Sequence, residues 1–115
     1  MKRITVLIRH LPLNTIRASE ALRVAVGYTL APHQVTALLV EHGVVAGATG
    51  LRAERIGQPG VAKHLEALKA LGHRVVADRR SHAALGGFSL HPAVEVLDRA
   101  EVLKLLEESD VVVPF

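Results

Sequence analysis

The sequence contains no cysteine. This absence excludes disulfide bonds, thiolate metal ligands, iron–sulfur clusters and any reaction in which a protein thiol carries sulfur. A persulfide needs a protein sulfur nucleophile, so none of the 115 residues can carry one. The chain by itself is therefore not a persulfide sulfurtransferase.

Aromatic residues are also scarce, at 3% of the chain against 50% hydrophobic residues, so the core must consist of Val, Leu, Ala and Ile. The formal charge of +3 comes mostly from arginines that are scattered rather than grouped in a basic block. Such a mild excess favours small anionic molecules about as well as nucleic acid. Proteins that bind unpaired bases stack them on aromatic rings, so we do not expect a nucleic-acid partner.

Long hydrophobic runs are absent too. The first run, residues 4–8, is shorter than the hydrophobic core of a signal peptide, and we expect a cytoplasmic protein without membrane contact. A length of 115 residues predicts a single domain over residues 1–115. The small number of Asn, Gln and Met residues is typical of a thermophile.

Five short apolar runs predict five strands. These predicted strands are residues 4–8, 34–41, 73–77, 94–97 and 111–113. The runs are continuous rather than alternating with polar residues, which indicates strands buried on both faces, as in a parallel sheet.

Between the strands, apolar residues recur at helical spacing. The first predicted helix is 18–30, capped by Asn14 or Thr15. The second has Pro59 in its first turn and Gly72 just past its end, with Val61, Leu65, Leu68 and Leu71 buried. The third is 79–85, closed by Gly86 or Gly87, and the last follows an Asp98–Glu101 capping box. The glycine-rich segment 44–60 is predicted to be a functional or interfacial loop with one turn around 51–56. This alternation predicts a flavodoxin-like, three-layer α/β/α sandwich around a five-stranded parallel sheet.

Polar residues follow three of the predicted strands where each strand ends. The carboxyl ends of parallel strands share one edge of the sheet, and open α/β proteins bind ligands there. The residues at this edge are His10, Asn14 and Arg17 after the first strand, Glu41 and His42 after the second, and Asp78, Arg79 and His82 after the third. We expect a ligand to contact Asn14, Arg17, His42, Asp78, Arg79 and His82.

Two interpretations of Asp78 stay open. Aspartate is a favoured N-cap, and at the start of helix 79–85 it needs no ligand. With His10 and His42 it also has the composition of an acid–base group or of a two-His, one-carboxylate metal site. We expect no metal, because no HxxH or HxxxH pair accompanies these residues. We expect no cofactor, because segment 44–60 contains neither a P-loop nor a dinucleotide fingerprint.

The other polar residues have simpler interpretations. Arg79 and Arg80 suit either an anionic ligand or a solvated helix face. Ser81 and His82 cannot form a nucleophile–base pair, because adjacent helical residues do not face each other. The remaining histidines are predicted to be hydrogen-bonded surface residues: His33, His64, His73 and His91.

Four short motifs follow one another along the chain. They are PLNTIRASEA after the first strand, Glu41-His42-Gly43-Val44 after the second, VVADRRSHAALGG around the third, and DVVVPF at the last. In this order they resemble the DsrE/DsrF-like proteins, whose members pass persulfide sulfur toward tRNA thiolation or dissimilatory sulfur oxidation. The resemblance implies a five-stranded α/β/α sandwich, a homo-oligomer (trimer or hexamer), and a sulfur-relay protein as partner.

The chain departs from that family at two positions. The resemblance implies a sulfur-carrying cysteine eight residues before Gly86, and that position is Asp78. His42 stands where the family commonly has an acid. The leading interpretation is a cysteine-free, non-catalytic oligomeric subunit, or a binder of small anions, associated with sulfur relay. The alternatives are an enzyme or metal-dependent binder that uses His10, His42 and Asp78, and a purely structural subunit.

Overall fold

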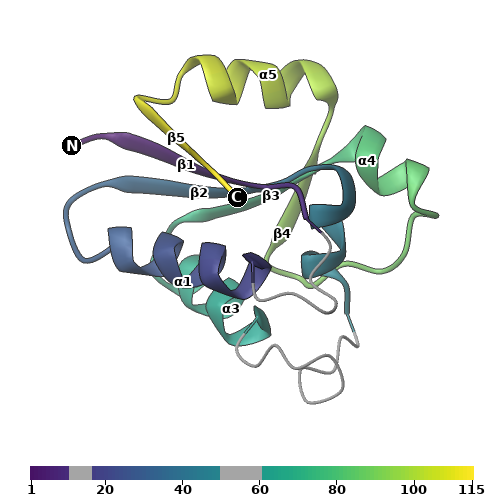
Figure 1. Cartoon of the computed structure of the whole chain (residues 1–115), viewed down its shortest axis with the longest axis horizontal. Helices are drawn as coiled ribbons and strands as arrows, with labels where there is room; N and C mark the ends of the chain where they lie inside the picture. The colour runs from purple at the N-terminus through teal and green to yellow at the C-terminus, as the bar shows by residue number, and fades with distance from the viewer. Residues whose placement is uncertain (11–16, 50–60) are drawn as a thin grey trace.

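The structure, a computed structural model, describes residues 1–10, 17–49 and 61–115, and the statements below concern those residues. They form one five-stranded sheet in the order β4-β3-β2-β1-β5, with every neighbouring pair parallel. The strands are β1 (Arg3–Ile8), β2 (Gln34–Leu39), β3 (Arg74–Asp78), β4 (Val94–Leu97) and β5 (Val111–Pro114). Figure 1 shows the sheet between two layers of helices.

The helices lie on both faces of the sheet and beyond one of its ends. They are α1 (Arg17–Tyr28), the 3-10 helix η1 (Glu41–Gly47), α3 (Val61–Ala70), α4 (Arg79–Ala84) and α5 (Arg99–Glu107). Helices α1 and α3 cover one face, and α5 covers the other (Figure 1). Helices η1 and α4 follow the carboxyl ends of β2 and β3 and contact each other. The predicted three-layer fold is confirmed.

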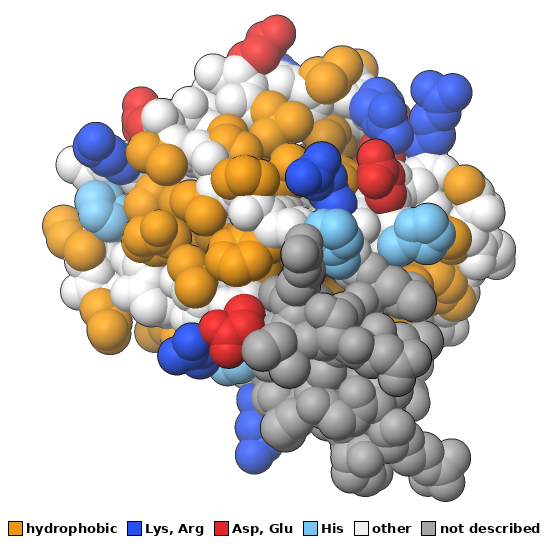
Figure 2. Space-filling view, in the orientation of Figure 1, with side chains coloured by type: hydrophobic (Ala, Val, Ile, Leu, Met, Phe, Trp, Pro, Cys, Tyr) orange, Lys and Arg blue, Asp and Glu red, His pale blue; other side chains and the backbone are white. Residues whose placement is uncertain are grey.

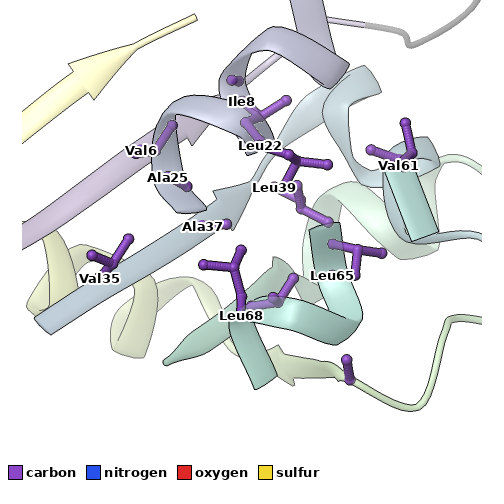
Figure 3. Close-up of a cluster of buried hydrophobic side chains, with 14 of the residues drawn as sticks. Val6, Ile8, Leu22, Ala25, Val35, Ala37, Leu39, Val61, Leu65 and Leu68 are labelled. Atoms are coloured by element: carbon purple, nitrogen blue, oxygen red, sulfur yellow. The ribbon is translucent and has the colours of Figure 1, made fainter. Parts of the chain in front are cut away.

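The strands are apolar because both faces of the sheet are buried. Successive side chains point to opposite faces, so Ala37 and Leu39 of β2 meet α1 and α3 in the larger core cluster (Figure 3). Leu38, between them, belongs to a smaller cluster with Val76 and Val102 under α5. The α1–α3 side therefore contributes most of the apolar burial, and the α5 side is the thinner layer.

The second predicted strand ends earlier than expected. Strand β2 stops at Leu39, and residues Glu41–Gly47 form η1 where we expected a strand end followed by a loop. Glu41 has a φ of 52°, in the left-handed region, and this sharp turn starts the helix. The turn predicted around residues 51–56 lies outside the described residues, as do Asn14 and Thr15.

Two details of the other helices also differ from the prediction. Leu71 was expected on the buried side of its helix, but α3 ends at Ala70 and the Leu71 side chain is exposed in the following turn. Asp98 is the N-cap residue of α5 as predicted, yet its side chain forms no cap hydrogen bond because it pairs with Arg79 instead. The predicted capping box is therefore wrong in its hydrogen bonds and right in its position.

Gly43 lies where η1 crosses the end of β1. A Cβ atom at this position would lie 2.0 Å from the carbonyl oxygen of Ile8 and 2.6 Å from its carbonyl carbon. Backbone atoms on both sides of this contact are fixed, so no side chain fits without a shift of η1. The glycine of the second motif is therefore required by the close approach between the backbones of η1 and β1.

We expect Gly43→Ala to lower the free energy of unfolding by about 1–3 kcal/mol, because the added methyl group overpacks a fixed backbone contact. Gly27→Ala in α1 is the matched control, since a Cβ at Gly27 meets nothing within 4 Å. It should raise stability by about 0.5–1 kcal/mol through helix propensity. Urea unfolding of both variants measures this, and equal effects would contradict the close approach.

Candidate functional site

Asp78 is the last residue of β3 and the N-cap of α4. Its side chain is fully buried, and both carboxylate oxygens accept hydrogen bonds. The guanidinium of Arg99 donates from Nε to Oδ1 at 3.2 Å and from Nη2 to Oδ2 at 2.6 Å. Ser81 donates to Oδ2 from its backbone amide at 3.1 Å and from its hydroxyl at 2.7 Å. The N-cap interpretation of Asp78 is therefore confirmed, and the ion pair with Arg99 adds to it.

Ser81 extends this network to the neighbouring strand. Its buried hydroxyl accepts a hydrogen bond of 2.8 Å from the backbone amide of Glu41, at the sharp turn that starts η1. Asp78 thus holds α4 directly, η1 through Ser81, and the first turn of α5 through Arg99. A buried carboxylate with this many donors is a structural hub as well as a candidate site.

The carboxylate is held in its charged form. Burial alone would raise the pKa of Asp78, but hydrogen bonds from Arg99 and Ser81 and the charge of Arg99 outweigh burial and hold that pKa below its usual value. A general base needs a lone pair that a substrate proton can reach, and the Asp78 carboxylate is fully buried, with three hydrogen bonds on Oδ2 and one on Oδ1. Chemistry at this position therefore falls to Arg99 rather than to Asp78.

Arg99 is the cation that pairs with the buried Asp78 carboxylate, and it is the solvent-exposed member of this pair. Its side chain is 47% exposed, whereas that of Asp78 is 0% exposed. Nη1 of Arg99 forms no hydrogen bond within the part of the chain that the structure describes. Because Nε and Nη2 are fixed by Asp78, the free edge of the guanidinium is held in one orientation, which suits an anion.

Other cations surround the ends of the strands. Arg9 follows β1 and Arg80 lies in the first turn of α4, and both are exposed without an ion pair to any described residue. Arg79 is engaged, with 2.6 Å between its Nε and Oδ1 of Asp98. Figure 2 shows Lys or Arg and His side chains gathered on this side of the molecule.

The predicted ligand residues lie in different surroundings. His42 is exposed in η1, and His10 is half-buried after β1. His82 points elsewhere: its Nε2 lies 2.6 Å from the carbonyl oxygen of Phe88, and the two rings pack edge to face. Arg17 is the first residue of α1, and Asn14 lies outside the described residues.

No three His, Cys, Asp or Glu side chains within residues 1–10, 17–49 and 61–115 are close enough together to hold a metal ion. His10, His42 and Asp78 therefore do not form a ligand set. Among the other histidines, three accept hydrogen bonds from backbone amides through Nδ1: His33 from Lys2, His73 from Val35 and His91 from Ala93. His64 has a buried Nδ1 that lacks a hydrogen-bond partner in the described chain.

Arg99 is the site residue that sequence reasoning missed. Strand β4 pairs with β3 so that Leu97 lies beside Asp78, which places the residues after Leu97 next to the carboxylate. The sequence contained half of this signal, because Arg99 directly follows the predicted start of the last helix. The missing half was the strand order, which puts β4 rather than another strand beside β3.

We expect the contribution of Asp78 to stability to depend on pH. Its pKa is lower in the folded protein than in the unfolded chain, so the stabilisation is present above the unfolded value of about 4 and is lost as pH falls through the folded value. Asp78→Asn should lower the free energy of unfolding by about 1–3 kcal/mol near neutral pH. Its difference from wild type should shrink below about pH 4.

Urea unfolding of both proteins between pH 3 and 7 measures this difference. Asp98→Asn is the control, because it removes a carboxylate that also pairs with an arginine but is 63% exposed. An exposed pair contributes at most about 1 kcal/mol, so this control should differ little from wild type. A difference between wild type and Asp78→Asn that stays constant down to pH 3 would contradict the buried ion pair.

No helix among the described residues is long and apolar enough to cross a membrane. The fold is shared with the ychN protein from E. coli, whose crystal structure matches with a TM-score of 0.79 and 20% identity over 100% of both chains. No curated protein matches the chain. The model of the DsrE/DsrF-like family matches residues 2–115, and the chain therefore belongs to the DsrE/DsrF-like family.

Proposed function

We propose that this protein is a non-catalytic, homo-oligomeric member of the DsrE/DsrF-like family that binds a small anion through Arg99 and works in association with sulfur relay. The observation that supports this proposal is the buried Asp78–Arg99 pair. It occupies the position at which sulfur-carrying relatives are expected to hold their cysteine. Where those relatives would carry sulfur covalently, this chain has a fixed, half-exposed guanidinium that binds reversibly.

The Nη1 edge of Arg99 suits an oxyanion, and the Glu41 carboxylate is a second negative group, besides Asp78, within electrostatic reach of that guanidinium. The free Nη1 edge can donate hydrogen bonds in the planar geometry that carboxylate, sulfate and phosphate accept. Arg9 and Arg80, which form no ion pair with a described residue, add positive charge at the same edge of the sheet. Asp78 occupies Nε and Nη2 of Arg99 and leaves the Nη1 edge for the anion. The ligand class follows from the donors and not from the family.

The place in sulfur relay rests on family membership and on the lack of cysteine. A subunit without a thiol cannot pass a persulfide along, so its contribution to a relay complex is binding or assembly. A cysteine-bearing relay protein is the partner that this role requires. An anion bound at Arg99 would then lie where the fold places sulfur in such a partner.

Homo-oligomerisation is supported by an exposed apolar edge. Strand β5 pairs only with β1 in the described sheet, and Val111 and Val112 on it are 37% and 41% exposed. Figure 2 shows a continuous patch of hydrophobic side chains on the face where β5 and α1 lie in Figure 1. Contiguous apolar patches and open edge strands on soluble proteins mark association surfaces.

We expect inorganic sulfate or phosphate to bind at Arg99 with a saturable change in the NMR signals of Arg99 and Ser81. Arg99→Gln should weaken this binding at least tenfold, because it removes the charged donors. Arg23→Gln is the matched control, since Arg23 is also an exposed arginine that pairs with a carboxylate, Glu20 on α1. Equal affinities in wild type and Arg99→Gln would contradict the proposal.

We expect the protein to sediment as an assembly of several copies, and Val112→Lys to shift it toward the monomer. The lysine would place a charge on the exposed edge strand β5. Leu103→Lys on α5 introduces the same charge at another apolar residue, 52% exposed, and should leave the assembly intact. Sedimentation velocity measures both variants, and a monomeric wild-type protein would rule out the homo-oligomer.

A further inference from the structure

A groove lies at the opposite end of the sheet from Asp78, between α5 and the amino-terminal ends of the strands. It has a volume of about 420 Å³, within the range of sites that take small molecules. None of the polar residues that line it takes part in the site described above. The sequence contains no sign of this groove, because the strand starts and the helix that form it are far apart in the chain.

The floor of the groove is a polar row across the sheet. Arg74 of β3, Thr36 of β2 and Thr5 of β1 are neighbours in register. All three point to the α5 face, on which the next row is formed by Leu38 and Val76 in the core. The polar row therefore lies just beyond the part of the sheet that α5 covers with apolar contacts.

The two threonine hydroxyls differ in their bonding. The hydroxyl of Thr5 lies 2.6 Å from that of Ser109, which in turn donates to the carbonyl of Leu105. The hydroxyl of Thr36 forms no hydrogen bond within the described residues, although the residue is only 8% exposed. A polar side chain that is nine-tenths buried, unpaired and part of the groove lining is a donor for a ligand.

One stripe of α5 forms the wall, with Glu101, Lys104, Leu105 and Glu108 at helical spacing. Ion pairs occupy the two ends of the groove: Arg3 lies 3.7 Å from Glu108, and Arg74 binds Glu95 through two hydrogen bonds of 3.0 Å. Between them, Lys104 and Glu101 form no ion pair with any described residue. The middle of the groove therefore offers the Lys104 ammonium and the Glu101 carboxylate on the same helix face, and the Arg74 guanidinium lies within electrostatic reach of Glu101.

We propose that this groove binds a small zwitterion of the α-amino acid type. A ligand carboxylate meets the Lys104 ammonium and the Thr36 hydroxyl, and a ligand ammonium meets the Glu101 carboxylate. Leu97 and Leu105 in the lining contact an apolar side chain of the ligand. A simple anion would leave Glu101 facing negative charge, and a simple cation would leave Lys104 facing positive charge. A ligand with both charges pairs both groups at once.

The test is an NMR titration of the full chain with L-phenylalanine and with two analogues that each lack one charge. These are 3-phenylpropionate, without the ammonium, and 2-phenylethylamine, without the carboxylate. L-phenylalanine should produce saturable shifts of the Thr36 and Lys104 amides and bind at least tenfold tighter than either analogue. Equal binding of 3-phenylpropionate, or no saturable shift with L-phenylalanine, would overturn the proposal.

Variants locate the binding in the groove. Lys104→Met should weaken binding of L-phenylalanine at least tenfold, and Thr36→Val, which keeps the side-chain shape, should weaken it two- to tenfold. Lys63→Met, an exposed lysine on α3 at the other face of the sheet, should change nothing. Unchanged affinity in Lys104→Met would overturn the proposal. Arg99 does not line the groove, so the loss of L-phenylalanine binding in Lys104→Met and the loss of anion binding in Arg99→Gln are separate results.

Discussion

The buried carboxylate of Asp78 is the interaction on which the carboxyl end of this fold depends. Taking a charge out of water is costly unless hydrogen bonds and an opposite charge compensate for it, and here three neighbouring elements supply that compensation. Arg99 comes from the start of α5, Ser81 from α4, and the amide of Glu41 is joined through Ser81. The geometry of the strand ends is set by this requirement.

The two faces of the sheet contribute differently to the molecule. The α1–α3 face is packed with aliphatic side chains and provides most of the hydrophobic stabilisation. The α5 face has a short apolar cluster in its middle, with Asp78 at one end and the row of Arg74, Thr36 and Thr5 at the other. Only α5 covers this face, and its apolar contacts do not reach the polar groups at either end. Both candidate sites therefore lie on the α5 face of the sheet.

The sequence was sufficient for the architecture, because strands buried on both faces are visible as continuous apolar runs such as 4–8 and 73–77. It also placed Asp78 at the start of a helix. It could not supply the strand order, and without that order nothing linked Asp78 to Arg99, 21 residues further along the chain. The groove was hidden for the same reason, since the register of Thr5, Thr36 and Arg74 exists only in the folded sheet.

The histidines show where position in the sequence suggested more than the structure contains. His10, His42 and His82 follow strand ends in the sequence, and that position alone suggested a common site. In the structure the His42 side chain is exposed to solvent, and the His82 side chain joins α4 to Phe88 in the segment that follows it. Position after a strand predicts the edge of the sheet on which a residue lies, but not the direction of its side chain.

Pro114 has a consequence for how the sheet can grow. The amide of Phe115 donates to Leu7 of β1, so the neighbouring amide position, that of Pro114, faces away from β1 toward the open edge. Proline has no N–H there, and a strand added from outside would lack a donor at the last residue of β5. Pro114 therefore opposes the addition of further strands to the sheet at β5. Side-chain contacts at the same edge are still possible.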